Sequence, residues 1–154
     1  MKVLEKNGQV IEGNFEEKEV KEAFWHTSAH VLAQAVKRLY PDTKCAIGPA
    51  IDNGFYYDFD FSFPFTEENL AAIEKEMKKI IKKGAKIERF TKSREDAIAF
   101  FKEKNEPYKV ELIEDLPEGE EISFYSQGDW VDLCAGPHLM STKGIKAFKL
   151  LSSS

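Results

Sequence analysis

The chain has 154 residues, 42% of them hydrophobic and 32% charged, which is typical of one globular domain with its own core. Its formal net charge of -5 argues against a stand-alone nucleic-acid binder, because phosphate contacts need a basic surface, although flanking domains could supply one. The N-terminus lacks a signal peptide's apolar core, and no apolar run reaches the length of a membrane span. We therefore expect a cytoplasmic protein with reduced thiols at Cys45 and Cys134.

The first part of the chain predicts a long helix followed by an extended aromatic segment. Apolar residues between Glu17 and Tyr40 recur at steps of four and three, as on one helix face, and Pro41 ends the pattern. Residues 44–61, "KCAIGPAIDNGFYYDFDF", look extended, with a tight turn at Asn53-Gly54. After the turn, aromatic residues at odd positions alternate with Tyr56, Asp58 and Asp60, as in a half-buried strand.

Two further helices and several strands complete the expected fold. Thr66 can cap a helix that ends at Gly84, and Ser93 opens another that runs to Lys104. The strand candidates are residues 86–90, 107–113, 121–125, 129–133 and 146–151. This order indicates an α+β fold in which a mostly antiparallel sheet packs with the long N-terminal helix and the two further helices.

All three histidines fall in two short motifs, His26-x3-His30 and Cys134-x3-His138. Residues i and i+4 share a helix face, and the Gly-Pro pair before His138 turns the chain back after the strand. We therefore predict that the four side chains meet in one cleft between the long helix and the sheet. They could bind zinc tetrahedrally, ring a polar pocket without metal, or be an ordinary buried thiol and hydrogen-bonded histidines.

Four stretches resemble the editing domain of threonyl-tRNA synthetases: "HTSAHVLAQAVKRLYP", "CAIGPAIDNGFYYDFDF", "EPYKVELI" and "VDLCAGPH". The two histidine motifs are common to alanyl-tRNA synthetases and free-standing alanyl-tRNA editing proteins, whereas "D-x-C-x-G-P-H" points to the threonyl branch. The resemblance implies an editing domain over residues 23–151. Residues 1–22 would be a linker remnant or a leading strand, and residues 152–154 a frayed or truncated end.

The resemblance implies that the domain hydrolyses serine wrongly esterified to threonine tRNA. A threonine-activating pocket cannot strongly reject serine, because one methyl group contributes only about 1–3 kcal/mol of discrimination, so a second site must correct the error. The implied partners are the 3′ end of tRNA(Thr) carrying serine and the remaining domains of a full-length synthetase, with no membrane. The aminoacylation activity would belong to another domain.

The resemblance also implies roles for seven residues. The catalytic set is His26, Lys109, His30 and Asp132, with His26 managing the water and Lys109 assisting at the ester or oxyanion. By spacing, Asp132 shares a strand face with Cys134, and it could hold the substrate ammonium or a histidine. The substrate-binding set is Tyr57, Cys134 and His138.

The favoured mechanism requires no cofactor, and zinc at His26, His30, Cys134 and His138 is the alternative. Three other interpretations stay open. They are a zinc-dependent trans-editing hydrolase of another aminoacyl-tRNA, a non-catalytic tRNA-docking module, and a structural zinc domain that unfolds on chelation.

Overall fold

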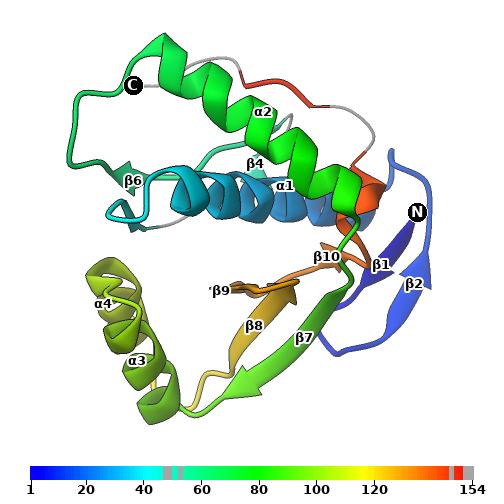
Figure 1. Ribbon diagram of the computed structural model, residues 1–154. Coiled ribbons are helices and arrows are strands. Elements are labelled where there is room, and N and C mark those ends of the chain that lie inside the picture. Colours follow the sequence, from blue (N-terminus) through cyan, green and yellow to red (C-terminus); the bar gives the residue numbers. More distant parts are fainter. Residues whose placement is uncertain (47–49, 52–53, 146–147, 151–154) are drawn as a thin grey trace.

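The computed structural model describes residues 1–46, 50–51, 54–145 and 148–150, and within these ranges it combines four α-helices with small antiparallel sheets (Figure 1). The helices are α1 (Lys18–Leu39), α2 (Glu67–Lys83), α3 (Arg94–Glu103) and α4 (Pro107–Asp115), and a 3-10 turn, η1, spans Thr142–Gly144. The strands are β1 (Lys2–Leu4), β2 (Val10–Glu12), β3 (Lys44–Cys45), β4 (Ala50–Ile51), β5 (Gly54–Phe55), β6 (Phe59–Asp60), β7 (Ile87–Lys92), β8 (Ile122–Gln127), β9 (Trp130–Leu133) and β10 (His138–Leu139).

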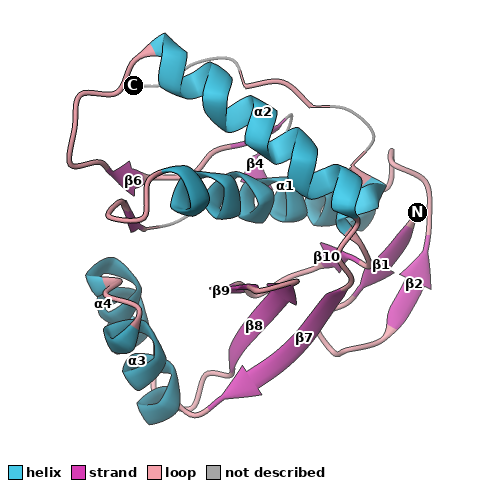
Figure 2. Ribbon diagram, viewed as in Figure 1, coloured by secondary structure: helices cyan, strands magenta, loops and turns pink. Residues whose placement is uncertain are grey.

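The described strands pair in four antiparallel groups instead of the one sheet that the sequence suggested. The orders are β10-β1-β2, β7-β8-β9, β3-β6 and β4-β5. Figure 2 shows α1 between α2 on one side and the β7-β8-β9 sheet on the other, with α3 and α4 at the far end of that sheet. The predicted mixture of helices and antiparallel strands is confirmed in this coarser form.

Helix α1 is the centre of the fold. Its middle section is buried on nearly every side, as expected of a helix covered by α2, by β10 and by the β4-β5 pair. The predicted ends of the next two helices are also confirmed. Thr66 and Asn69 form a capping box at the start of α2, Gly84 ends that helix with a left-handed φ of 68°, and Ser93 accepts a hydrogen bond from the Asp96 amide at the start of α3.

The segment 107–113 was predicted as a strand, and this prediction is wrong: it forms helix α4. Pro107 occupies the first turn, where its missing N–H costs nothing and its fixed φ suits a helix. Lys109, Val110 and Ile113 are the buried positions, which is helical spacing. Packing of α4 against α3 overrides the strand preference of the β-branched residues, in a second core formed by Ala97, Phe101, Val110, Ile113, Ile122 and Phe124.

Two other segments differ in detail from their expected strands. Burial alternates as predicted, with Tyr57 buried between exposed Tyr56 and Asp58, but pairing is confined to the short β5 and β6. Asn53 of the expected turn lies outside the described residues. Of the expected strand 146–151, residues 146, 147 and 151 lie outside them too, and residues 148–150 are not in a strand.

The leading residues contribute strand β1 to the β10-β1-β2 sheet, in which Leu4 pairs with His138. Val3 and Leu4 are buried in the main core. Across the described ranges, every helix is too short or too polar to cross a lipid bilayer.

Candidate active site

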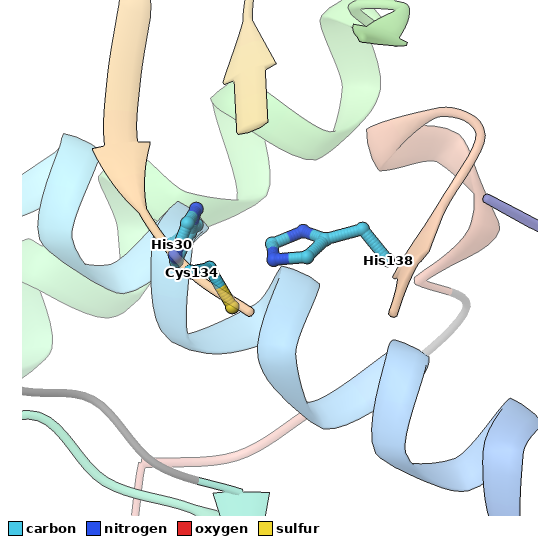
Figure 3. Close-up of side chains that lie close together, drawn as sticks. All are labelled: His30, Cys134 and His138. Atoms are coloured by element: carbon cyan, nitrogen blue, oxygen red, sulfur yellow. The ribbon is translucent and has the colours of Figure 1, made fainter. Parts of the chain in front are cut away.

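Three side chains from distant parts of the sequence converge beside α1. His30 comes from α1, Cys134 follows β9, and His138 lies in β10, and one ligand atom of each falls within 4.8 Å of the other two (Figure 3). Both imidazoles are almost fully buried, and their ring centroids are 4.4 Å apart. The predicted meeting of the two histidine motifs is therefore present in the structure.

His26 stands next to this cluster but is not part of it. Its ring stacks on that of His138 with centroids 5.9 Å apart, and its Nδ1 lies 3.2 Å from the carbonyl oxygen of Pro137. A carbonyl can only accept a hydrogen bond, so Nδ1 carries the proton and Nε2 of the neutral ring has the free lone pair. Burial lowers the pKa of His26, which favours this neutral form, the one able to accept a proton.

A buried ion pair from α4 and β9 forms the second part of the site. Lys109 Nζ lies 2.9 Å from Asp132 Oδ1 and donates to the hydroxyl of Tyr57 at 2.6 Å. That hydroxyl donates to Asp132 Oδ2 at 2.7 Å, which closes a ring of three polar groups. Burial raises the pKa of Tyr57 far above its ordinary value, so the phenol keeps its proton and stays a donor.

Both parts border one cavity of about 260 Å³. Six of the seven residues implied by the family resemblance line it: His26, His30, Tyr57, Lys109, Asp132 and Cys134. The seventh, His138, lies directly behind His30 and Cys134 with no exposed surface. The rest of the wall is mostly apolar, with Glu120, Glu121 and Ser123 as its other polar residues, so the cavity offers a cation, a carboxylate and a neutral imidazole beside apolar side chains.

Sequence reasoning missed Glu106, which fixes the position of Lys109. Glu106 immediately precedes α4 and is 6% exposed. Its carboxylate accepts hydrogen bonds from Lys37 Nζ and from the Cys45 amide, each at 2.9 Å. These contacts anchor the start of α4 to α1 and β3, and they hold Lys109, one turn further on, against Asp132.

The cluster of His30, Cys134 and His138 fits a metal ion chemically. Among the described residues, His30 Nδ1 and His138 Nε2 are buried without hydrogen-bond partners. Burial raises the pKa of Cys134 to about 12, so the thiol is neutral unless a cation stabilises the thiolate. Two nitrogens and one sulfur suit zinc with an open fourth position. In a tetrahedral zinc site the ligand atoms lie about 3.5 Å apart. In this structure they lie within 4.8 Å of one another, so the side chains would have to draw closer by about 1 Å.

Gly136 allows the turn that returns the chain to His138. Its φ is +84°, and a β-carbon placed there would lie 2.1 Å from the Tyr125 hydroxyl. Gly119 has a similar φ of +87°, but a β-carbon there would meet nothing within 4 Å. An alanine at either position would strain the backbone, but only an alanine at Gly136 would also overlap with a neighbouring side chain.

Gly136→Ala should lower the free energy of unfolding by about 1–3 kcal/mol more than Gly119→Ala does. Both changes carry the cost of a left-handed non-glycine residue, about 1–2 kcal/mol, but overpacking against Tyr125 adds to it only at Gly136. Urea unfolding of the two variants measures the difference. Equal losses would show that the turn tolerates a side chain at Gly136.

Comparison with known proteins adds independent information. Residues 122–154 match the family model described as "Threonyl and Alanyl tRNA synthetase second additional domain". The chain is 66% identical over 149 residues to the threonine--tRNA ligase of Caldanaerobacter subterraneus subsp. tengcongensis, an alignment that covers 97% of this chain and 23% of that protein. It is 67% identical over 138 residues to the threonine--tRNA ligase of Acetivibrio thermocellus, covering 90% of this chain and 22% of the relative.

A third relative, the threonine--tRNA ligase of Clostridium botulinum strain Langeland, is 62% identical over 152 residues, which is 99% of this chain and 24% of the relative. The chain thus spans about a quarter of the length of these curated relatives.

Proposed function

We propose that this chain, which carries the second additional domain of threonyl and alanyl tRNA synthetases and is homologous to a segment of threonine--tRNA ligases, hydrolyses the ester of Ser-tRNA(Thr). The observation that carries the proposal is one cavity bordered by both a neutral imidazole with a free Nε2 and a buried lysine. A base and a fixed cation on one wall of a pocket are what ester hydrolysis by water needs.

The proposed reaction uses groups of this chain. Nε2 of His26 takes a proton from a water molecule as its oxygen attacks the ester carbonyl carbon. Lys109 has one N–H beyond its contacts to Tyr57 and Asp132, and this group faces the negative charge that develops on the carbonyl oxygen. When the bond to the ribose oxygen breaks, the imidazolium of His26 returns its proton to that oxygen, releasing free serine and tRNA.

The remaining site residues hold this arrangement in place. Asp132 balances the charge of Lys109 within the protein, and Tyr57 fixes the geometry of the pair by bonding to both partners. The proposed partners are the serine-bearing 3′ end of tRNA(Thr) and the other domains of a full-length ligase. Those domains would raise the effective concentration of the tRNA near a chain whose own net charge is -5.

The proposal is tested by supplying pre-formed Ser-tRNA(Thr), Thr-tRNA(Thr) and Ala-tRNA to a threonine--tRNA ligase that contains this chain, with and without a chelator. Serine should be released, and the threonyl ester should be spared by about 10- to 200-fold, the range that one methyl group allows. Chelation should leave the rate unchanged. No serine release above the rate in buffer would make the domain a docking module, and preferential release of alanine would assign it another substrate.

A zinc-dependent hydrolase is the second candidate, and the unpartnered nitrogens of His30 and His138 beside Cys134 favour it. A zinc ion held by these three residues would polarise the ester carbonyl and lower the pKa of a bound water. His26, which lies outside the three-residue cluster, would act as the proton acceptor in either case.

Cys134→Ser separates the two candidates. In the metal-free reaction it should slow hydrolysis about tenfold or less, because a serine hydroxyl can still accept the bond that the thiol accepts from the Gly136 amide at 3.3 Å. Cys45→Ser, which changes a buried thiol outside the 260 Å³ cavity, is the control. Hydrolysis rate and zinc content are measured in parallel, and the joint loss of both in Cys134→Ser alone would favour the zinc candidate.

A further inference from the structure

Thr27 is fully buried on α1, and its hydroxyl contacts three groups at once. Oγ1 lies 2.8 Å from the carbonyl oxygen of Ala23, one turn earlier in the helix. It lies 2.9 Å from the amide nitrogen of Leu139 and 3.3 Å from Nδ1 of His138. The hydroxyl therefore joins the helix to the strand that carries His138.

The chemistry of these groups determines where each proton lies. The hydroxyl hydrogen of Thr27 could point to the Ala23 carbonyl or to His138 Nδ1, and the carbonyl is the nearer acceptor, at 2.8 Å against 3.3 Å. The Leu139 amide can only donate, so it uses one lone pair of Oγ1. With the hydrogen directed to the Ala23 carbonyl, Oγ1 has only its second lone pair for His138, and Nδ1 of the ring is the donor.

The second nitrogen of His138 is then an acceptor. His138 has no exposed surface, and its Nε2 is buried without a hydrogen-bond partner among the described residues. A second proton there would be a buried donor with no acceptor, so the ring carries one proton. The Tyr125 ring stacks on the imidazole at 4.1 Å and 17°, which holds its plane. Figure 3 shows the ring of His138 directed toward Cys134 and His30.

We propose that Thr27 is a positioning residue that holds His138 as the Nδ1–H tautomer, so that Nε2 presents a lone pair to the side of the cluster formed by His30 and Cys134. Nε2 has no hydrogen-bond partner among the described residues, so this lone pair is available to accept a bond from the neutral Cys134 thiol or to bind a cation. Thr27 thus sets which nitrogen of His138 faces the cluster as an acceptor. Its effect on ester hydrolysis rests on the proposed function, but the tautomer does not.

The tautomer is measured directly by long-range ¹⁵N–¹H correlation of the histidine rings at neutral pH, without substrate or metal. His138 should show a pyrrole-type shift at Nδ1 and a pyridine-type shift at Nε2, and a His138→Asn variant identifies its signals. In Thr27→Val, which keeps the shape and removes the hydroxyl, the Nε2–H form should appear, and Thr27→Ser should restore the original pattern. The Nε2–H form in the unmodified chain, or an unchanged tautomer in folded Thr27→Val, would overturn the proposal.

Hydrolysis provides the second readout. In the full-length ligase, Thr27→Val should lower kcat for Ser-tRNA(Thr) with little change in KM, by about tenfold or less in the metal-free reaction and by about 10- to 100-fold if the cluster holds zinc. Thr27→Ser should recover most of the loss. Because the unmodified chain alone reports the tautomer, the proposal stays testable even if Thr27→Val does not fold. An Nδ1–H tautomer in a chain that hydrolyses nothing would refute the proposed function and leave the role of Thr27 intact.

Discussion

Replacing His26 with alanine should slow the hydrolysis of pre-formed Ser-tRNA(Thr) by about 10²- to 10⁴-fold, the usual contribution of one positioned acid-base group. The reason is geometric: Nδ1–H of His26 donates a hydrogen bond to the Pro137 carbonyl, so the lone pair is on Nε2, and the ring borders the cavity. Threonylation by the same ligase should continue at its original rate, because this chain is only about a quarter of such an enzyme. Serine-charged tRNA(Thr) should then accumulate.

His26→Asn is the matched control for structure. An asparagine amide can still donate to the Pro137 carbonyl but cannot take a proton from water, so this variant should unfold like the unmodified chain and hydrolyse as slowly as His26→Ala. The deacylation rate and the urea midpoint are the two measurements. A His26→Asn variant that edits at full rate would remove His26 from the chemistry.

Lys109→Met should have two separate effects. It removes the cation from a pair in which Lys109 and Asp132 are 3% and 1% exposed, so the free energy of unfolding should fall by about 3–5 kcal/mol as a buried carboxylate loses its partner. It should also slow hydrolysis by about 10²- to 10³-fold, because the developing oxyanion loses its donor. Urea unfolding and deacylation of Ser-tRNA(Thr) report the two effects independently.

The double variant Lys109→Met with Asp132→Asn distinguishes these effects. It removes both charges, so most of the lost stability should return while hydrolysis stays slow. If hydrolysis recovered together with stability, Lys109 would be a structural residue, and the cation in the proposed mechanism would have to come from elsewhere.

Three of the four helices could be predicted because their sequences carry recognisable spacing and capping patterns. The spacing of apolar residues and the caps at Thr66, Gly84 and Ser93 are properties of a few neighbouring residues, and α1, α2 and α3 follow them. Helix α4 has only nine residues, and its β-branched side chains favour a strand. Its helical form depends on packing against α3, which a local pattern cannot reveal.

Some residues of the candidate site could also be predicted from local sequence patterns, and others could not. The confinement of all histidines to two motifs was enough to predict that they meet, but the part given to Lys109 came from the family resemblance, because a lysine after Pro-Tyr has no distinctive pattern. Thr27, Glu106 and Tyr125 carried no signal at all. Their importance arises from contacts with residues far away in the sequence, such as the bond between Glu106 and Cys45, which are 61 residues apart.

The pairing of Leu4 with His138 has a consequence for how the protein folds. The site joins the beginning, middle and end of the described chain, and Thr27 and His138 alone are separated by 111 residues. Closing so long a loop costs entropy that nearby contacts do not repay, so helices α1 and α2 can form well before the histidine cluster does. During synthesis on the ribosome, β10 emerges after the other strands of the described residues, and His138 can join His30 and Cys134 only then. The proposed hydrolysis would therefore depend on a late step of folding, and a chain arrested before residue 138 should contain the four helices and the β7-β8-β9 sheet but lack the histidine cluster.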